Sequence, residues 1–259
     1  MRNFDPFLTL MDSAQAFHFE NIDGVYAACV AGRIVTHTDE DEFSKNYFDD
    51  FRDYDALLHS ELDEKTRLAV SSLPGLRVLN QPAWEALLAF ILSANNNVKR
   101  IRLSVKLLNE KYGYVRTFNG HTLYGFPSPE TLSKLTDTEL QKEIRCGYRA
   151  KYLIETAKMI LDGFSLEELR EAPYEIARKR LMELSGVGGK VADCVALFGL
   201  GHTSAFPVDV WVKRLMANWY GVEGNPEFVR KEARRIFGEN CGIYQQSLFH
   251  AARTGIIEV

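Results

Sequence analysis

A glycine-rich segment between two helix-like stretches is the feature that most constrains the fold of this 259-residue chain. The segment reads LMELSGVGGKVADCVALFGL, and apolar residues recur at helical spacing on both sides of its glycines. Glycines such as Gly186 and Gly188 permit positive φ angles and the close approach of another backbone. The pattern predicts a helix–hairpin–helix over about residues 174–201, with Leu184 and Val187 packed into the core.

Two other phosphate-binding patterns fit this segment poorly. A P-loop needs a preceding strand and a hydroxyl after its lysine, but Lys190 follows a helical stretch and precedes Val191. A dinucleotide-binding GxGxxG motif would need a third glycine and a strand. In a helix–hairpin–helix, free N–H groups near Gly189 can hold a phosphate of the DNA backbone. A tight turn between two helices, with glycine as a C-cap, is the alternative for this motif alone.

Lys190 and Asp209 are the candidate catalytic residues. Lys190 begins the second helix, where the positive end of the helix dipole favours a neutral, nucleophilic amine. Asp209 lies in PVDV at a predicted helix start. Taken singly, the lysine could be a phosphate-binding surface residue and the aspartate a plain N-cap. Together they indicate N-glycosidic bond cleavage, in which the amine attacks a sugar carbon and the carboxylate stabilises the developing cation.

Composition places the chain among ordinary globular proteins with one or two domains. Hydrophobic residues make up 46% and charged residues 25%. The longest apolar run, around residues 87–94, is too short to span a bilayer, and the N-terminus lacks a signal-peptide layout, so a cytoplasmic protein is expected. The four cysteines form no CxxC pair, and no metal site is predicted.

The net charge of −4 is unevenly distributed along the chain. Residues 1–65 carry 15 acidic and 5 basic side chains, whereas the remainder carries 20 acidic and 26 basic ones. Such asymmetry is typical of a protein with a basic face on its later part, although charged runs usually only solvate a surface.

The coarse pattern predicts an α+β, mainly α chain. Short apolar stretches in AFHFENIDGVYAACVAGRIVTH are broken by Asp23-Gly24 and Gly32-Arg33, which predicts an antiparallel meander. From about residue 43 the pattern becomes helical, with segments bounded by glycine or proline. We expect a small N-terminal antiparallel sheet domain with connecting helices over residues 1–75 and a helical body over residues 76–259.

Several segments resemble the 8-oxoguanine DNA glycosylase/AP lyase family of the helix–hairpin–helix DNA glycosylase superfamily. SAQAFHF resembles the family's SGQSFRW, SANNNVKRI its SSNNNIARI, CGYRAKY its LGYRARY, and GIYQQSLFHA its GWAQAVLFSA. The hairpin, Lys190, VADC and PVDV match as well, so the resemblance extends over almost the whole chain in one order. It implies a bifunctional base excision repair enzyme that acts as a monomer on double-stranded DNA containing a damaged base. No cofactor is implied, apart from a structural monovalent cation that hairpin carbonyls could hold.

The resemblance also assigns roles to individual residues. Lys190 would be the nucleophile and Asp209 its catalytic partner, leading to a Schiff base and β-elimination. The superfamily's alkylation-repair branch keeps the aspartate but lacks the lysine, so Lys190 favours a bifunctional enzyme. Phe249 and Cys194 would lie on the two faces of the flipped guanine, with Gln245 on its Watson–Crick edge.

Further matches concern the DNA. Asn95 would fill the gap left by the flipped base, and Tyr148 would act as the wedge. Arg100 and Arg149 would read the orphaned cytosine. Ordinary interpretations are a helix-terminal asparagine, a packed tyrosine and surface arginines. The backbone N–H groups around Gly186, Gly188 and Gly189 would contact phosphate.

The chain departs from the family at two positions. Ala14 replaces a glycine whose backbone carbonyl accepts N7–H of 8-oxoguanine, the donor that distinguishes this lesion from guanine. Trp211 replaces a histidine that follows PVDV. Two rival hypotheses therefore remain open: a helix–hairpin–helix glycosylase for another damaged base, and a non-catalytic DNA-binding module.

Overall fold

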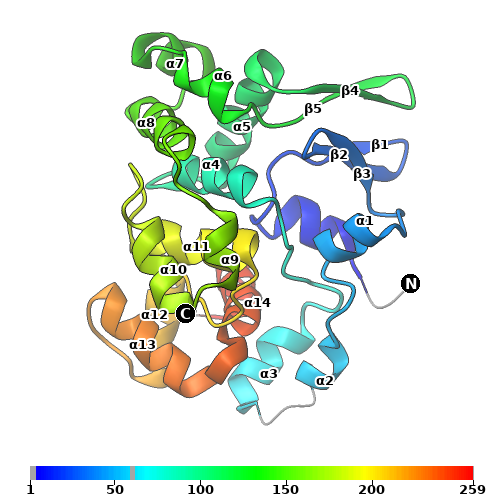
Figure 1. Ribbon diagram of the computed structural model, residues 1–259. Helices are drawn as coiled ribbons and strands as arrows, with labels where there is room; N and C mark the ends of the chain where they lie inside the picture. Colours follow the sequence, from blue (N-terminus) through cyan, green and yellow to red (C-terminus); the bar gives the residue numbers. More distant parts are fainter. Residues whose placement is uncertain (1–3, 59–61, 259) are drawn as a thin grey trace.

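The computed structural model describes residues 4–58 and 62–258 and confirms a mainly helical chain with a small sheet (Figure 1). The predicted meander is present as a three-stranded antiparallel sheet in the order β1-β2-β3. Its strands are β1 (Glu20–Ile22), β2 (Val25–Val30) and β3 (Arg33–Thr36). Ala27 of β2 lies opposite Glu20 on one side and Thr36 on the other. A short π-helical segment, Phe7–Asp12, precedes the sheet and was not predicted.

Helices make up most of the remaining chain, and none of those in the described ranges is long and apolar enough to cross a membrane. They are α1 (Glu42–Tyr47), α2 (Tyr54–Leu58), α3 (Glu64–Ser71), α4 (Ala83–Ser93), α5 (Val98–Tyr112), α6 (Pro129–Ser133), α7 (Asp137–Ile144), α8 (Arg149–Leu161), α9 (Glu167–Glu171), α10 (Tyr174–Leu181), α11 (Gly189–Leu200), α12 (Val210–Tyr220), α13 (Pro226–Phe237) and α14 (Cys241–Thr254).

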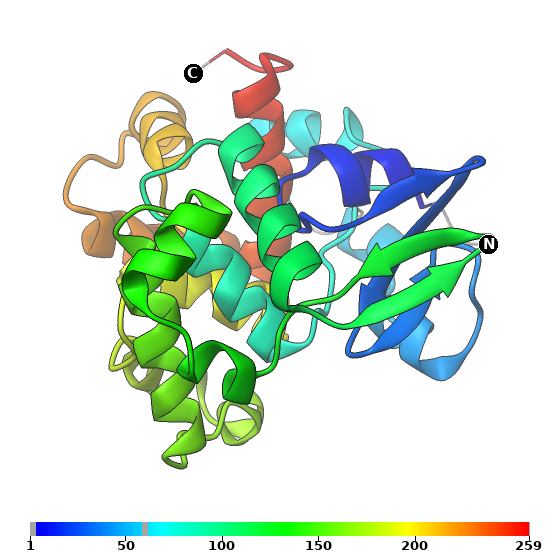
Figure 2. The same cartoon turned by 90° about the horizontal axis from the view of Figure 1, so that it is seen from above.

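A second hairpin, β4 (Val115–Phe118) and β5 (His121–Tyr124), interrupts the helical body. Both views place it beside the N-terminal sheet (Figures 1 and 2), and Leu123 is buried in one cluster with residues of that sheet. Conversely, α3 packs against α14 at the other end of the sequence. Contacts therefore cross residue 75 in both directions, and the two-domain division stays a prediction.

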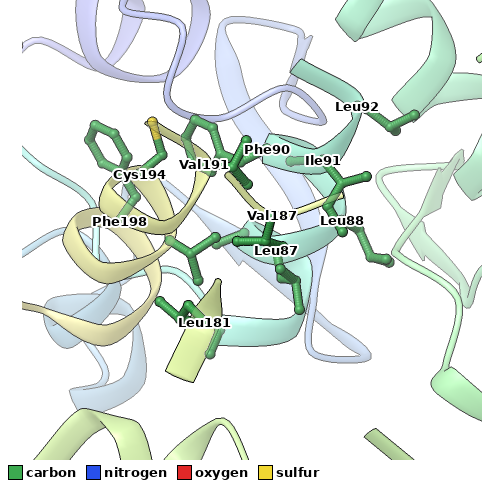
Figure 3. Packing of buried hydrophobic residues seen from close by; sticks show 14 of the residues in the cluster. Leu87, Leu88, Phe90, Ile91, Leu92, Leu181, Val187, Val191, Cys194 and Phe198 are labelled. Carbon is green, nitrogen blue, oxygen red and sulfur yellow. The ribbon is translucent and has the colours of Figure 1, made fainter. Parts of the chain in front are cut away.

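The core that positions the site is formed by α4 and α11. Almost every residue of both helices is buried, as expected for helices that are apolar on all sides. Gly199 permits their close approach, because a Cβ there would lie 2.9 Å from the Cβ of Ala86. Phe90 and Phe198 stack across the contact, with ring centroids 5.3 Å apart (Figure 3). These contacts hold α11 tightly against α4.

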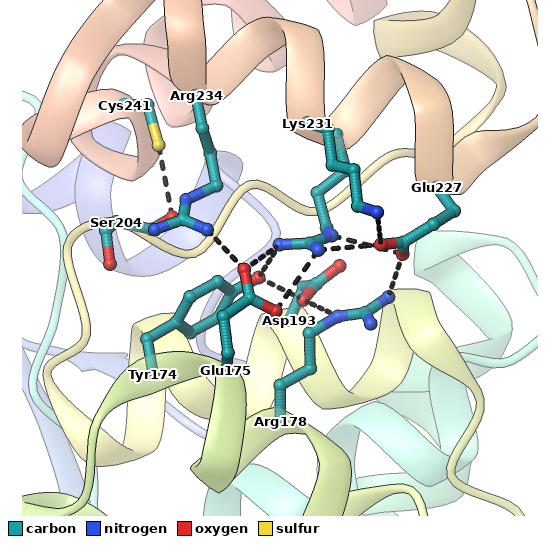
Figure 4. A network of polar contacts seen from close by, with 10 residues as sticks. Tyr174, Glu175, Arg178, Asp193, Ser204, Glu227, Lys231, Arg234 and Cys241 are labelled. Carbon is teal, nitrogen blue, oxygen red and sulfur yellow. Dashed lines mark hydrogen bonds and ion pairs between the residues drawn. The ribbon is translucent and has the colours of Figure 1, made fainter.

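A polar network fixes the other side of α11 (Figure 4). Asp193 accepts hydrogen bonds from the Tyr174 hydroxyl and from Arg178 Nε, both at 2.7 Å. Arg230, from α13, is almost fully buried and pairs with Glu175 of α10. Burial raises the pKa of Asp193 to about 6, against the opposing effect of Arg178. The network joins α10, α11 and α13 into one unit around the hairpin.

Candidate active site

The predicted hairpin lies between α10 and α11, and Leu184 and Val187 are buried in the main core as expected. Gly186 has φ +75°, and a Cβ there would lie 2.5 Å from the ring of Tyr152, so glycine is required at this position. Gly188 does not use the positive φ that a glycine permits. Gly188 is extended (φ −87°, ψ 178°) because it serves as the N-cap of α11.

The N-cap Gly188 has no side chain, so the first N–H groups of α11, which belong to Gly189 and Lys190, have no side-chain cap. A Cβ at Gly188 would meet nothing within 4 Å, which leaves room for another molecule's backbone. The turn therefore has the geometry of an anion-binding helix start.

The structure brings together the six residues predicted for catalysis and base binding. They line one cavity of about 50 Å³: Ala14, Lys190, Cys194, Asp209, Gln245 and Phe249. Phe90, Phe198, Pro207 and Gln246 complete its lining and were missed. The two phenylalanines were missed because an apolar side chain in a helix pattern is normally interpreted as a core residue. A larger cavity of about 540 Å³ contains neither Lys190 nor Asp209, so volume alone does not identify the site.

Lys190 points from the start of α11 towards α4. Its Nζ donates to Ser93 Oγ at 3.2 Å and lies 5.4 Å from the centroid of the Phe90 ring. The side chain is half-buried. The amine is thus held by one neutral hydroxyl and an aromatic face, and no ion pair to it is found among the described residues.

Asp209 is the N-cap of α12, and its Oδ1 accepts the Val212 N–H at 2.9 Å. Burial raises the pKa of its carboxyl, while this hydrogen bond and the Lys190 ammonium act in the opposite direction. Asp209 therefore both caps α12 and lines the cavity that contains Lys190.

Cys194 and Phe249 supply apolar walls of the cavity. Cys194 lies one helical turn beyond Lys190, and burial raises the pKa of its thiol to about 11, which keeps it neutral. Phe249 lies one turn beyond Gln245 on α14 and is partly buried, with the Arg253 guanidinium 5.9 Å from its ring centroid. The two walls of the cavity therefore come from different helices, α11 and α14.

Gln245 presents an acceptor that no described residue satisfies. Its Nε2 donates to the Pro207 carbonyl at 3.0 Å. A carbonyl only accepts, so the amide orientation is fixed and Oε1 must point elsewhere. Oε1 is buried without a hydrogen-bond partner among the described residues. Because a buried unpaired acceptor is costly, this atom indicates a donor on a bound molecule.

Ala14 has the left-handed conformation that the replaced glycine would favour, with φ +60°. Such a conformation is uncommon for a residue with a Cβ. The backbone of this segment therefore follows the path expected for glycine although the side chain has changed.

The predicted DNA-contacting residues are not all placed alike. Asn95, Arg100 and Tyr148 are exposed, and Asn95 has φ +48°. Arg149 is 5% exposed, and its guanidinium donates to the carbonyls of Ala94 and Asn95. The Arg149 side chain therefore points into the protein, whereas Asn95, Arg100 and Tyr148 are exposed at the surface.

Trp211 is partly buried against a hydrophobic cluster that includes Leu215 of α12 and Leu248 of α14, and the guanidinium of Arg214 lies 5.7 Å from its ring centroid.

Comparisons with known proteins identify the family of this chain. Residues 88–239 match the family model described as HhH-GPD superfamily base excision DNA repair protein. The "Probable N-glycosylase/DNA lyase" of Methanothermobacter thermautotrophicus is 35% identical over 217 residues, which are 76% of this chain and 70% of that protein. The N-glycosylase/DNA lyase of Saccharomyces cerevisiae is 38% identical over 170 residues, and the match spans 45% of its length.

Among solved structures, the Clostridium acetobutylicum 8-oxoguanine glycosylase/lyase, in complex with double-stranded DNA containing cytosine opposite 8-oxoG, superposes with a TM-score of 0.90. It is 31% identical, and the match covers 98% of this chain and 93% of that one. The chain belongs to the HhH-GPD superfamily of base excision DNA repair proteins.

Proposed function

We propose that this protein is a bifunctional DNA glycosylase/AP lyase that excises 8-oxoguanine paired with cytosine and then nicks the abasic strand. The observation that carries the proposal is that Lys190 and Asp209 line the same small cavity as the apolar side chains of Cys194 and Phe249 and the unpaired acceptor of Gln245. The names of the yeast, archaeal and clostridial proteins described above support the same activity.

In the proposed reaction, Lys190 gives up its ammonium proton and the free amine attacks C1′ of the flipped nucleotide. The bond between C1′ and N9 breaks, and the base leaves with the electron pair and takes up a proton. The Asp209 carboxylate stabilises positive charge as it develops on the sugar. The attached amine then loses a proton and the C1′–O4′ bond opens, so that O4′ takes up this proton as a hydroxyl and a Schiff base remains at C1′.

Strand nicking follows from the Schiff base. Removal of a C2′ proton expels the 3′ phosphate by β-elimination, and water later hydrolyses the imine to free Lys190. The proposed reaction uses only the Lys190 amine and the Asp209 carboxylate. A monovalent cation held by hairpin carbonyls would have a structural role. Its DNA substrate would place the protein in the cytoplasm, at the nucleoid.

For recognition, we propose that the flipped base lies between Cys194 and Phe249. Gln245 Oε1 would accept N–H groups from the Watson–Crick edge of guanine, and the Ala14 carbonyl would accept N7–H. The cavity of about 50 Å³ is far smaller than typical ligand pockets of roughly 300–1,000 Å³. We therefore expect Phe249, which is only partly buried, to move as the base enters.

The exposed Asn95, Arg100 and Tyr148 would contact the DNA left behind by the flipped base. Arg149 would have to exchange its bonds to the Ala94 and Asn95 carbonyls for the edge of the orphaned cytosine. The hairpin at Gly188 and Gly189 would hold a backbone phosphate.

Borohydride trapping tests the catalytic part of the proposal. A duplex with 8-oxoguanine opposite cytosine should give a covalent protein–DNA adduct, and Lys190→Gln should give none. A matched control is Lys179→Gln, which alters an exposed lysine of α10. Absence of an adduct with the unaltered protein would instead support a non-catalytic DNA-binding module.

A panel of duplexes that carry different damaged bases opposite cytosine tests the substrate. We expect the fastest excision for 8-oxoguanine. An equal or faster excision of another lesion would favour a helix–hairpin–helix glycosylase of different specificity.

A further inference from the structure

The segment from Met11 to Gln15, which carries Ala14, is held through its backbone carbonyls. Four of these five carbonyls accept a hydrogen bond from a side chain of another part of the molecule. The pairs are Arg102 to Met11, Arg253 Nη2 to Asp12 at 2.6 Å, Gln246 Nε2 to Ser13 at 2.8 Å, and Gln81 Nε2 to Gln15 at 2.9 Å.

The carbonyl of Ala14 differs from its four neighbours. Within residues 4–58 and 62–258, no donor to it is found, and Ala14 lines the cavity that contains Lys190. Among these five backbone carbonyls, that of Ala14 is therefore the one without a donor in the described residues, and Ala14 belongs to the candidate site.

Burial makes these carbonyl bonds persistent. Ser13 and Gln15 are fully buried, and the donors Gln246 and Gln81 are 2% and 3% exposed. Because these groups are buried, water cannot replace either glutamine as a donor, and a carbonyl that lost its glutamine would remain without a hydrogen bond. The positions of the peptide units on both sides of Ala14 are thus strongly determined.

Ala14 needs such support because of its backbone conformation. At φ +60° an alanine is strained, and strained residues persist only where the surrounding structure holds them. The peptide unit between Ser13 and Ala14 sets this φ angle, and Gln246 holds the carbonyl of that unit. Without this bond, Ala14 could relax to a negative φ, which would reorient its carbonyl.

We propose that Gln246, supported by Gln81 and Arg253, is a positioning residue that sets lesion specificity. It holds Ala14 in the left-handed conformation, so that the Ala14 carbonyl is the one acceptor that distinguishes 8-oxoguanine from guanine. This inference rests on the proposed function, and it explains how an alanine takes the place of the expected glycine.

The test measures Kd for a duplex with 8-oxoguanine opposite cytosine and for the undamaged duplex, in a Lys190→Gln background that prevents turnover. The ratio of the two Kd values reports discrimination. Gln246→Met keeps the side-chain length but removes the donor, and it should lower this ratio by about tenfold. Gln141→Met, on an exposed position of α7, is the matched control and should leave the ratio unchanged.

A second substitution distinguishes positioning from general destabilisation. Ala14→Gly in the Gln246→Met background should restore several-fold of the lost discrimination, since glycine adopts positive φ without strain. Thermal unfolding of each variant shows whether it is folded. If Gln246→Met does not fold, Gln81→Met, which removes the neighbouring donor, replaces it.

The outcomes separate the inference from the proposed function. Full discrimination in the Gln246→Met protein, or no rescue by glycine, overturns the inference while lesion preference of the Lys190→Gln parent still supports the proposed function. Equal binding of both duplexes by that parent contradicts the proposed substrate and the inference together. In that case, borohydride trapping with the unaltered protein shows whether the proposed glycosylase/lyase chemistry is still supported.

Discussion

Asp209 combines a capping role with a place beside Lys190, and the two roles can be separated by substitution. Asparagine is as good an N-cap as aspartate but carries no charge. Asp209→Asn should therefore leave the free energy of unfolding nearly unchanged and lower single-turnover excision by roughly 10²–10³-fold, the usual cost of a lost electrostatic group. Asp209→Ala should in addition lose about 1 kcal/mol of stability with the cap.

Single-turnover rates on the lesion duplex and urea unfolding of the same preparations check both effects. Wild-type excision by Asp209→Asn would mean that the carboxylate serves only as the N-cap of α12. The charge on Asp209 would then need no catalytic explanation.

Single site residues could be predicted from the sequence where a residue type is unusual for its place in the pattern. A lysine and an aspartate close in sequence to a predicted phosphate-binding turn were recognisable, and the structure places both at one cavity. Phe90 and Phe198 were not recognisable, because a wall of the site and a core residue have the same apolar pattern. The inward position of Arg149 also depends on carbonyls some 55 residues away in the chain, which no local pattern reveals.

Among the structural elements, the hairpin between α10 and α11 makes different demands on its two turn glycines. Gly186→Ala would place a Cβ against the Tyr152 ring at a positive φ, so we expect it to destabilise the protein by at least about 2 kcal/mol. Gly188→Ala meets no neighbour and has an extended backbone, so its stability should change by less than about 1 kcal/mol.

Urea unfolding and DNA titration together check this pair. If a phosphate approaches the open side of Gly188, then Gly188→Ala should weaken binding of undamaged duplex while the fold is retained. Equal stability of the Gly186→Ala and wild-type proteins would contradict the required approach to Tyr152.

The elements differ in how well the sequence predicted them. The N-terminal meander was predicted because its turn dipeptides separate short apolar runs. The β4–β5 hairpin was missed, although Asn119 and Gly120 both have the positive φ angles typical of a tight hairpin turn. Its strands are mostly exposed and pack on the distant N-terminal sheet, so their apolar pattern is weak.

Across the whole molecule, the N-terminal sheet and the helical body are joined by a buried polar contact. Glu85 of α4 accepts the Ala31 N–H through Oε1 at 2.7 Å, and its Oε2 lies 4.0 Å from His18 Nε2. Burial raises the pKa of Glu85 to about 8, opposed by the Ala31 hydrogen bond. Burial, with a smaller effect of Arg102, lowers the pKa of His18 to about 4. Both groups are therefore mainly uncharged at neutral pH.

These pKa shifts make the contribution of the His18–Glu85 contact to the free energy of unfolding depend on pH, with a direction that differs for the two groups. The stability that neutral His18 contributes is present above its unfolded pKa of 6.5 and is lost as the pH falls towards 4. The stability from protonated Glu85 is present below its unfolded pKa of 4.5 and is lost as the pH rises through about 8. Between pH 6.5 and 8 the proton bound to Glu85 in the folded state is the main contribution of these two groups, so their share of the free energy of unfolding should fall, by at most about 1.4 kcal/mol per pH unit.

Glu85→Gln should remove this decline. The glutamine Oε1 can still accept the Ala31 N–H, but the side chain no longer titrates. Urea unfolding at several values between pH 6.5 and 8 should give a falling stability for the wild-type protein and a flatter profile for the variant. Glu168→Gln, at an exposed position of α9, is the control that should keep the wild-type decline. A variant that declines as steeply as the wild type would show that the loss of stability arises elsewhere than at this joint.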